Sequence, residues 1–301
     1  MSGWWRTLIA IAAGLASLTV TSGAYADSKE RLNLYQMVAR SELVVHVRVR
    51  EGALRYALVD VIEEFRGEAP TDRLRIVFRD FNTARQRKEG AIVFPDGQEE
   101  ILFLVPYRFA KNKEKHRDLF ELLHGAQGRI TVPAEGTDAL LDALRHLASM
   151  VGMDPASQLG ELKKQIGIPN NYLLETALDE LLRMNAGTPY LYPSLIPLLT
   201  NPSPGIRVRS TRLIERIFAS SLFDPLGESP DQAGFALSAV IERARNDEVV
   251  EVRVWAVRTM AAWRDRQKVE SELRAIAVGD RSQEVRLEAE RVLYRQRLAP
   301  S

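Results

Sequence analysis

Two stretches of the sequence, NDEVVEVR at residues 246–253 and GDRSQEVR at residues 279–286, decide the fold of the C-terminal third. Each contains an Asp followed six residues later by an Arg, and the two arginines stand 33 positions apart. An earlier copy, NPSPGIR at residues 201–207, ends on the same kind of Arg. Because such periods are typical of stacked supersecondary units, the repeat predicts an array of helical hairpins and argues against an enzyme core. The residues that define the repeat are Arg207, Asp247, Arg253, Asp280 and Arg286.

The residue types in each copy indicate how one hairpin would hold together. The Asp is placed to accept hydrogen bonds from backbone N–H groups where the second helix begins. The Arg is placed to reach a carbonyl or carboxylate of its own turn or of the neighbouring one. A small residue three positions later lets the two helices lie close, and an apolar residue four positions further on fills the seam. These residues are Ser210, Ala256 and Ala289, then Ile214, Met260 and Leu293. Since one hairpin cannot bury its own apolar face, stacking is expected.

Residues 188–298, with a predicted first helix of each hairpin at 192–199, 237–245 and 269–278, resemble the HEAT repeats of exported bacterial proteins. The resemblance implies a groove-forming α-solenoid that serves in protein binding or scaffolding. The first copy departs from the pattern, because Ser203 stands where an acid is common and its turn is one residue shorter. Residues 220–234 form an insertion between the first two hairpins, which is interpreted either as a contact element or as a tolerated surface loop.

The region that precedes the helices alternates with the period of a β-strand. Leu43, Val45, Val47 and Val49 are predicted to form one apolar face of the first strand. Further strands are expected at 56–62, 74–78, 101–105 and 128–132, which favours a small barrel or sandwich. SELVVHVRV at 41–49, VIEEFRG at 61–67 and ILFL at 101–104 resemble the OB-like or netrin-like β-domain of exported bacterial proteins. Animal netrin-like domains carry disulfides and this sequence has no Cys, so a protease-inhibitor role of the β-domain is an alternative that rests on the fold resemblance alone.

Between these two regions the apolar spacing becomes helical. Helices are predicted at 138–151, 159–166 and 172–184, the first of them capped by Thr137. The expected class is therefore α+β multidomain, with a small N-terminal barrel or sandwich followed by a HEAT-like solenoid. The predicted divisions are a signal peptide at 1–26, the β-rich domain at 27–135, a helical connection at 136–187 and the repeats at 188–301.

The N-terminus carries the features of a secretory signal. Arg6 precedes an apolar or small run from Leu8 to Val20, and Ala24-Tyr25-Ala26 offers the small-x-small pattern of a cleavage site. A Sec-type signal cleaved after Ala26 predicts a periplasmic or secreted protein that does not span the membrane once processed. The alternative is an uncleaved anchor, although a spanning helix requires about 20 mostly apolar residues and this run is interrupted by polar ones.

Composition narrows the range of functions. Removing Arg6 with the signal leaves 40 basic and 40 acidic residues, and this balance argues against a nucleic-acid partner. The absence of Cys excludes disulfides, thiolate nucleophiles and thiolate metal sites. Phosphate-binding and nucleophile-elbow motifs are missing, so no catalytic residue, metal or cofactor is predicted. A metal-dependent hydrolase using His116, Glu121 and His124 stays open as an alternative, without the spacing of a zinc peptidase.

Binding surfaces are the remaining hypothesis, and two features supply candidates. Basic residues cluster in two loops of the β-domain, where they would meet anionic lipid or glycan or else keep strand edges apart. Trp263, followed by charged residues, is a candidate for an exposed protein contact, whereas Trp255 is expected in the core. The basic candidates are Arg85, Arg87, Lys88, Lys111, Lys113 and Lys115. The sequence therefore predicts a non-catalytic adaptor with a protein partner, with an anionic lipid or glycan binder as the alternative.

Overall fold

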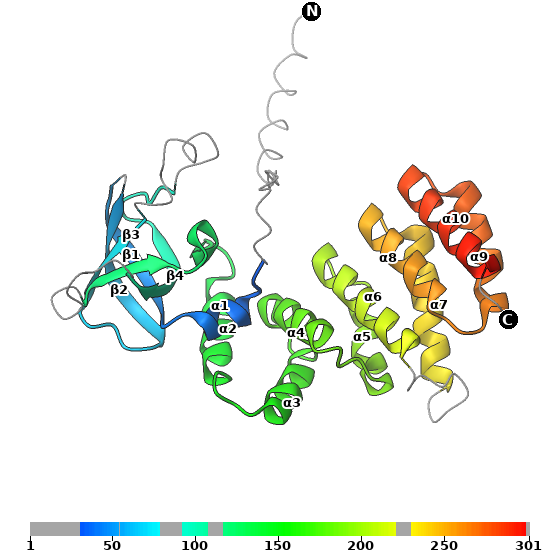
Figure 1. Cartoon of the computed structure of the whole chain (residues 1–301), viewed down its shortest axis with the longest axis horizontal. Coiled ribbons are helices and arrows are strands. Elements are labelled where there is room, and N and C mark those ends of the chain that lie inside the picture. The colour runs from blue at the N-terminus through cyan, green and yellow to red at the C-terminus, as the bar shows by residue number, and fades with distance from the viewer. Residues whose placement is uncertain (1–30, 54, 79–91, 108–116, 221–229, 299–301) are drawn as a thin grey trace, which may run out of the picture.

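A computed structural model describes residues 31–53, 55–78, 92–107, 117–220 and 230–298. Figure 1 shows the β-strands at one end of the molecule, helices α1 to α4 in the middle and helices α5 to α10 at the other end. The chain is thus a mixed α+β protein. The predicted signal peptide, the basic loop residues and most of the 220–234 insertion lie outside the described residues.

The strands are β1 Leu43–Gly52, β2 Tyr56–Arg66, β3 Arg73–Val77, β4 Glu99–Pro106, β5 Leu119–Leu122 and β6 Arg129–Thr131. They pair in the order β1-β2-β3-β5-β4, and β4 pairs again with β1, so five strands close into a barrel with β6 attached to β4. β3 and β5 are parallel, and the other pairs are antiparallel. The barrel decides between the two predicted β architectures. It also includes a strand that was not among the five predicted, β5 at Leu119–Leu122.

The barrel has two apolar surfaces because β1 and β4 alternate. Leu43, Val45, Val47 and Val49 of β1 pack inside the barrel with Leu102 and Leu104 of β4. On the outer side, Val44, Ile101 and Phe103 join the core that continues into the helices. A domain boundary near residue 135 therefore crosses a continuous apolar core rather than an exposed linker.

Four helices connect the barrel to the rest of the chain, and they are α1 Leu34–Arg40, α2 Thr137–Ser149, α3 Pro155–Gln165 and α4 Asn171–Arg183. α2 docks on β2 through Arg145, whose Nε and Nη2 donate to the two carboxylate oxygens of Glu63 at 2.8 and 2.9 Å. Thr137 does not cap α2 as predicted. Its hydroxyl donates to the Pro133 carbonyl, and Gly136 at φ 77° occupies the cap position, because the chain turns there through the left-handed region.

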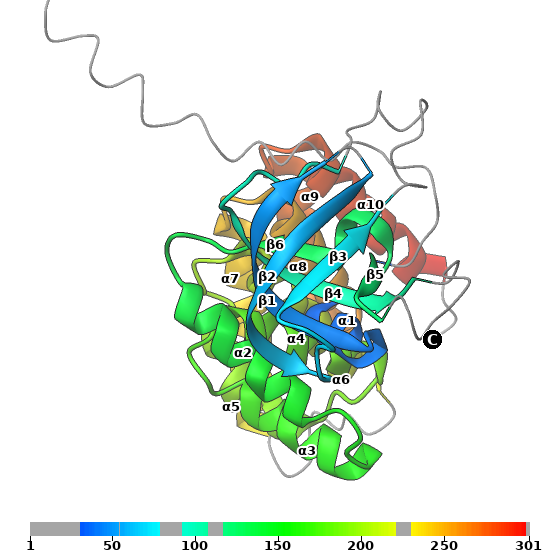
Figure 2. The ribbon, with the colours of Figure 1, turned by 90° about the vertical axis from the view of Figure 1, so that its left-hand side faces the viewer.

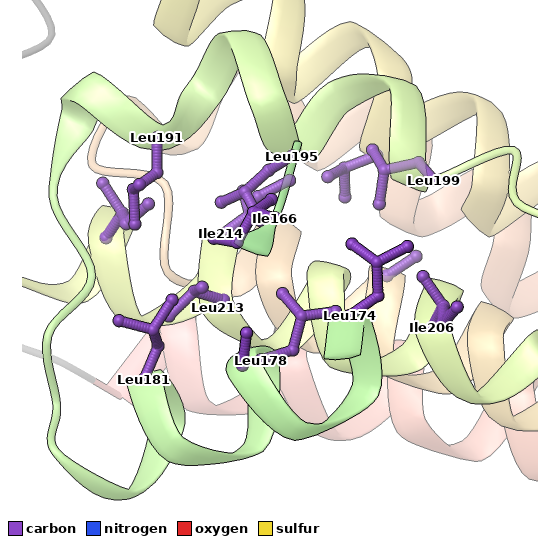
Figure 3. Packing of buried hydrophobic residues seen from close by; sticks show 14 of the residues in the cluster. Ile166, Leu174, Leu178, Leu181, Leu191, Leu195, Leu199, Ile206, Leu213 and Ile214 are labelled. Atoms are coloured by element: carbon purple, nitrogen blue, oxygen red, sulfur yellow. The ribbon is translucent and has the colours of Figure 1, made fainter. Parts of the chain in front are cut away.

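The remaining helices form a stack, and they are α5 Tyr192–Leu198, α6 Pro204–Ala219, α7 Pro230–Asn246, α8 Val250–Ala261, α9 Arg266–Gly279 and α10 Gln283–Leu298. One layer runs α4-α6-α8-α10, and the other runs α5-α7-α9 (Figure 1). Leucines and isoleucines of α4, α5 and α6 meet between the layers, with Leu174, Leu195 and Ile214 among them (Figure 3). Within the described ranges, no helix is both long and apolar enough to cross a bilayer.

Candidate functional site

A cleft of about 890 Å³ lies where the N-terminal segment meets the start of the stack. Residues 31–37 form one wall, Ile130 of β6 contributes at one side, and α4 and the first turn of α6 form the other wall. Its volume is within the range of 300 to 1,000 Å³ that is usual for ligand sites. Four segments from different parts of the sequence build it, so the cleft exists only in the folded chain.

The α6 wall of the cleft is organised around Arg209. Its Nε donates to Asp179 Oδ1 at 2.8 Å, and its Nη1 lies 3.8 Å from Glu175 Oε2. Glu175 also accepts from the Ser203 hydroxyl at 3.1 Å. Burial would lower the pKa of Arg209, but the hydrogen bond that it donates to Asp179 and the nearby carboxylates outweigh burial and raise the pKa. A Cβ at Gly205 would lie 2.8 Å from Arg209 Nη1, so a glycine leaves room for the guanidinium. This wall therefore carries both positive and negative side chains, and their mutual contacts hold them in place.

The opposite wall of the cleft is held in place by the hydrogen bonds of Asn33. Asn33 caps α1, since its side chain accepts from the Gln36 N–H and the Gln36 side chain accepts from the Asn33 N–H. Asn33 Nδ2 also donates to Glu180 Oε1 of α4 at 2.7 Å. Glu180 is fully buried, and its second oxygen accepts from Arg183. Burial and the Glu180 charge raise the pKa of Tyr35 beside it. A buried, satisfied carboxylate thus ties the N-terminal wall to the stack.

The repeat residues come together in a single ladder along the turns of the stack. Asp247 accepts from the Val249 N–H at 3.0 Å, and Asp280 accepts from the Ser282 N–H at 2.7 Å. Arg253, which is 1 % exposed, donates to the carbonyl of Asp247 at 2.7 Å and to the carboxylate of Asp280 at 3.0 and 3.1 Å. Arg207 makes the equivalent contacts to Asn201 O and to Asp247. These residues bind adjacent turns to one another.

The relative burial of the two tryptophans of this region is the reverse of what the sequence predicted. Trp263 is 4 % exposed and meets Phe218 edge-on at 4.9 Å, so the prediction of an exposed contact at Trp263 is wrong. It follows the end of α8, where the chain turns back toward α9 and carries the ring into the core. Trp255 is only partly buried, with the guanidinium carbons of Arg212 and Arg258 each 4.7 Å from its ring centroid.

The histidines take separate structural positions. His46 is buried and lies 3.0 Å from Glu99, while His124 begins the turn Gly125–Gly128 with φ 53°. Glu121 lies on β5, and His116 falls outside the described residues. Among the residues that are described, no group of three or more His, Cys, Asp or Glu is arranged to hold a metal.

The basic loop candidates lie outside the described residues, but the strands beside them carry an arginine surface of their own. Arg48 and Arg50 of β1 and Arg73 and Arg75 of β3 are exposed and flank Asp60 of β2. Asp60 pairs with Arg73 at 3.2 Å and with Arg50 at 3.7 Å. Figure 2 shows β1, β2 and β3 at the front, on the side facing away from the stack.

Comparison with protein-family models, with curated proteins and with solved structures finds no match for this chain. The sequence had pointed to none of the cleft residues. Their only sequence signal is the N-terminal capping box at Asn33 and Gln36, which marks a helix start but not a cavity.

Proposed function

We propose that this chain is an exported, non-catalytic adaptor that binds a segment of a partner protein in the cleft between residues 31–37 and α4–α6. The proposal takes the barrel as OB-like and the helical stack as HEAT-like. The cleft is the observation that carries it, because it is the place where the stack, the barrel edge and the N-terminal segment meet. Stacked helical repeats offer extended surfaces of this kind to other proteins.

The chemistry of the cleft favours a polypeptide over a small uniform ligand. A peptide backbone presents donors and acceptors together, and the walls supply both, with Asn33 and Arg209 on the donor side and Glu175 and Asp179 on the acceptor side. Leu34 and Tyr172 add apolar surface for side chains. Because ion pairs and the capping box already hold these groups in place, little side-chain entropy would be lost on binding.

Position-specific photo-crosslinking tests the proposal. A photoreactive phenylalanine replaces Tyr172, which lines the cleft, in the chain that begins at Asp27. After irradiation in the native envelope fraction, we expect one protein adduct whose yield is unchanged between low and high salt, since a bound segment would cover the charges of the cleft and covered pairs are screened little. Mass spectrometry then identifies the bound segment.

The matched control places the same photoreactive residue at Tyr190, an exposed tyrosine that does not line the cleft. We expect no adduct of the same protein from this position. Equal adducts from positions 172 and 190, or none from position 172, would contradict the cleft as the binding site.

The arginine surface on β1–β3 supports a second candidate, an envelope ligand of anionic lipid or glycan. Arg75 has no ion pair among the described residues; its guanidinium carbon lies 5.8 Å from the Tyr56 ring centroid. Arg50 and Arg73 share Asp60, so this surface has more guanidinium groups than carboxylates.

Replacing Arg50 and Arg75 together with Ala is expected to weaken binding to vesicles rich in an anionic phospholipid by roughly 30-fold. The estimate takes about 1 kcal/mol for each Arg near an anionic surface. Co-sedimentation measures it, with an acidic polysaccharide in a parallel assay to separate the two ligands. Arg274→Ala, on the exposed side of α9, is the control that should bind like the unchanged protein. Unchanged binding by the double variant would exclude this surface.

A further inference from the structure

The ladder arginines follow one bonding rule, and Arg207 and Arg253 both satisfy it in full. Arg207 places Nε and Nη2 on the Asp247 carboxylate at 2.9 and 3.0 Å, and Arg253 does the same to Asp280. Each Arg also donates to the carbonyl of the residue six positions earlier in its own turn. One edge of each guanidinium thus donates to a carbonyl of its own turn, and the other edge donates to a carboxylate of the following turn.

Arg286 fulfils only the first half of that rule. Its Nη1 donates to the Asp280 carbonyl at 2.6 Å, as the rule requires within its own turn. Within the part of the chain that the structure describes, no carboxylate lies within ion-pair distance of it. The second edge of the Arg286 guanidinium, on the outer face of α10, therefore has no carboxylate partner among the described residues.

The apolar residues around Arg286 are exposed where their counterparts are covered. Leu287 follows Arg286 as Val208 and Val254 follow the other ladder arginines. Val208 and Val254 are 8 % and 5 % exposed, whereas Leu287 is 43 % exposed. In the other layer, Arg245 of α7 stands eight residues before Arg253 and pairs with Glu272 of α9. The residue at the same position before Arg286 is Val278 of α9, and it is 86 % exposed. The end face of the stack has the character of an interior interface.

We infer that this end face, defined by Arg286, Leu287, Glu290 and Tyr294 of α10, binds the same face of a second copy of the chain. Glu290 supplies the argument for this partner. It is exposed four residues after Arg286, and the described residues include no ion pair to it. The face thus holds a guanidinium and a carboxylate that both lack an ion pair among the described residues.

A two-fold axis satisfies both groups at once. When two α10 helices pack antiparallel about an axis near residue 288, Arg286 of each copy faces Glu290 of the other. Leu287 meets its own counterpart close to the axis, and Tyr294, which is largely exposed in one copy, covers the start of the partner helix. An isologous interface requires such self-complementarity. Charge complementarity therefore selects a second copy over an unrelated helical partner.

Sedimentation equilibrium of the chain from Asp27 tests this inference. We expect twice the monomer mass at micromolar concentration. Glu290→Arg should shift the protein to monomer by placing like charges across the axis, and Leu287→Asp should do the same from the apolar side. Adding Arg286→Glu to Glu290→Arg reverses both charges and should restore the dimer.

Two results would overturn the inference. One is a monomer at all concentrations up to the solubility limit. The other is a dimer that both Glu290→Arg and Leu287→Asp leave intact, which would place the interface elsewhere. Since Arg286 also supports its own turn, thermal unfolding of each variant is measured alongside, and Glu290→Arg, which breaks no described contact, is the decisive variant.

Discussion

Replacing Arg253 with Ala is expected to lower the free energy of unfolding by about 4 kcal/mol. Arg253 is 1 % exposed, and its guanidinium bonds to the carboxylate of Asp280 and to the carbonyls of Asp247 and Glu248. Removing one partner of a buried ion pair leaves the other charge uncompensated, which costs about 3 to 5 kcal/mol. Chemical denaturation followed by circular dichroism measures the loss.

Arg274→Ala is the matched control for that prediction. Arg274 pairs with Glu270 one turn away on the exposed surface of α9, where its side chain is 61 % exposed. Exposed ion pairs of this kind contribute about 0.2 to 1 kcal/mol. Equal losses for Arg253→Ala and Arg274→Ala would show that the ladder does not hold the turns together. A larger loss for Arg253→Ala alone ties the stability of the stack to the contact between adjacent turns.

Trp263→Ala is expected to destabilise the protein by about 3 to 5 kcal/mol, the usual cost of truncating a buried aromatic residue. The indole packs edge-on against Phe218 of α6, which in turn lies 6.0 Å from the Tyr192 ring of α5, so the variant loses a contact at the centre of an aromatic cluster. Trp263 lies in the same buried cluster as residues of α6 and α9, so truncation to Ala leaves a cavity in the core. Thermal and chemical unfolding both measure this change.

Trp255→Ala serves as the control for Trp263→Ala because the residue type is the same and the burial differs. Trp255 is partly exposed and stacks with Arg212 and Arg258, contacts that contribute roughly 0.5 to 1 kcal/mol each at an exposed site. We expect the Trp255 variant to lose no more than about half as much stability. The reverse order would return Trp255 to the core and Trp263 to the surface, as the sequence had suggested.

Most regular elements could be predicted because their signals are local. The alternation in Leu43–Gly52 predicts one buried apolar face, and the strand formed as expected, with that face inside the barrel. Helix periodicity placed α2, α3 and α4 within a few residues of their ends. β5 was missed because its four residues suit a short strand or a helix equally well, and it is settled by pairing with β3 and β4.

The two tryptophans show where local reasoning fails. Neighbouring residues suggested that Trp263, followed by Arg264 and Asp265, would face water. Burial is decided by the turn between α8 and α9, which directs the ring toward Phe218 of α6. The cleft has the same origin, since residues 31–37, α4 and α6 are brought together only by packing. Spacing along one segment carries no information on which distant segment it meets.

The sequence by itself determined the period of the repeats, the residues that meet within a turn and most of the strands, because these depend on neighbours a few positions apart. Tertiary structure alone decided which carboxylates Arg207 and Arg253 bind, which tryptophan is buried and where the cleft lies. The physical reason is that these features depend on surfaces contributed by segments far apart in sequence, and such surfaces exist only after the segments have packed.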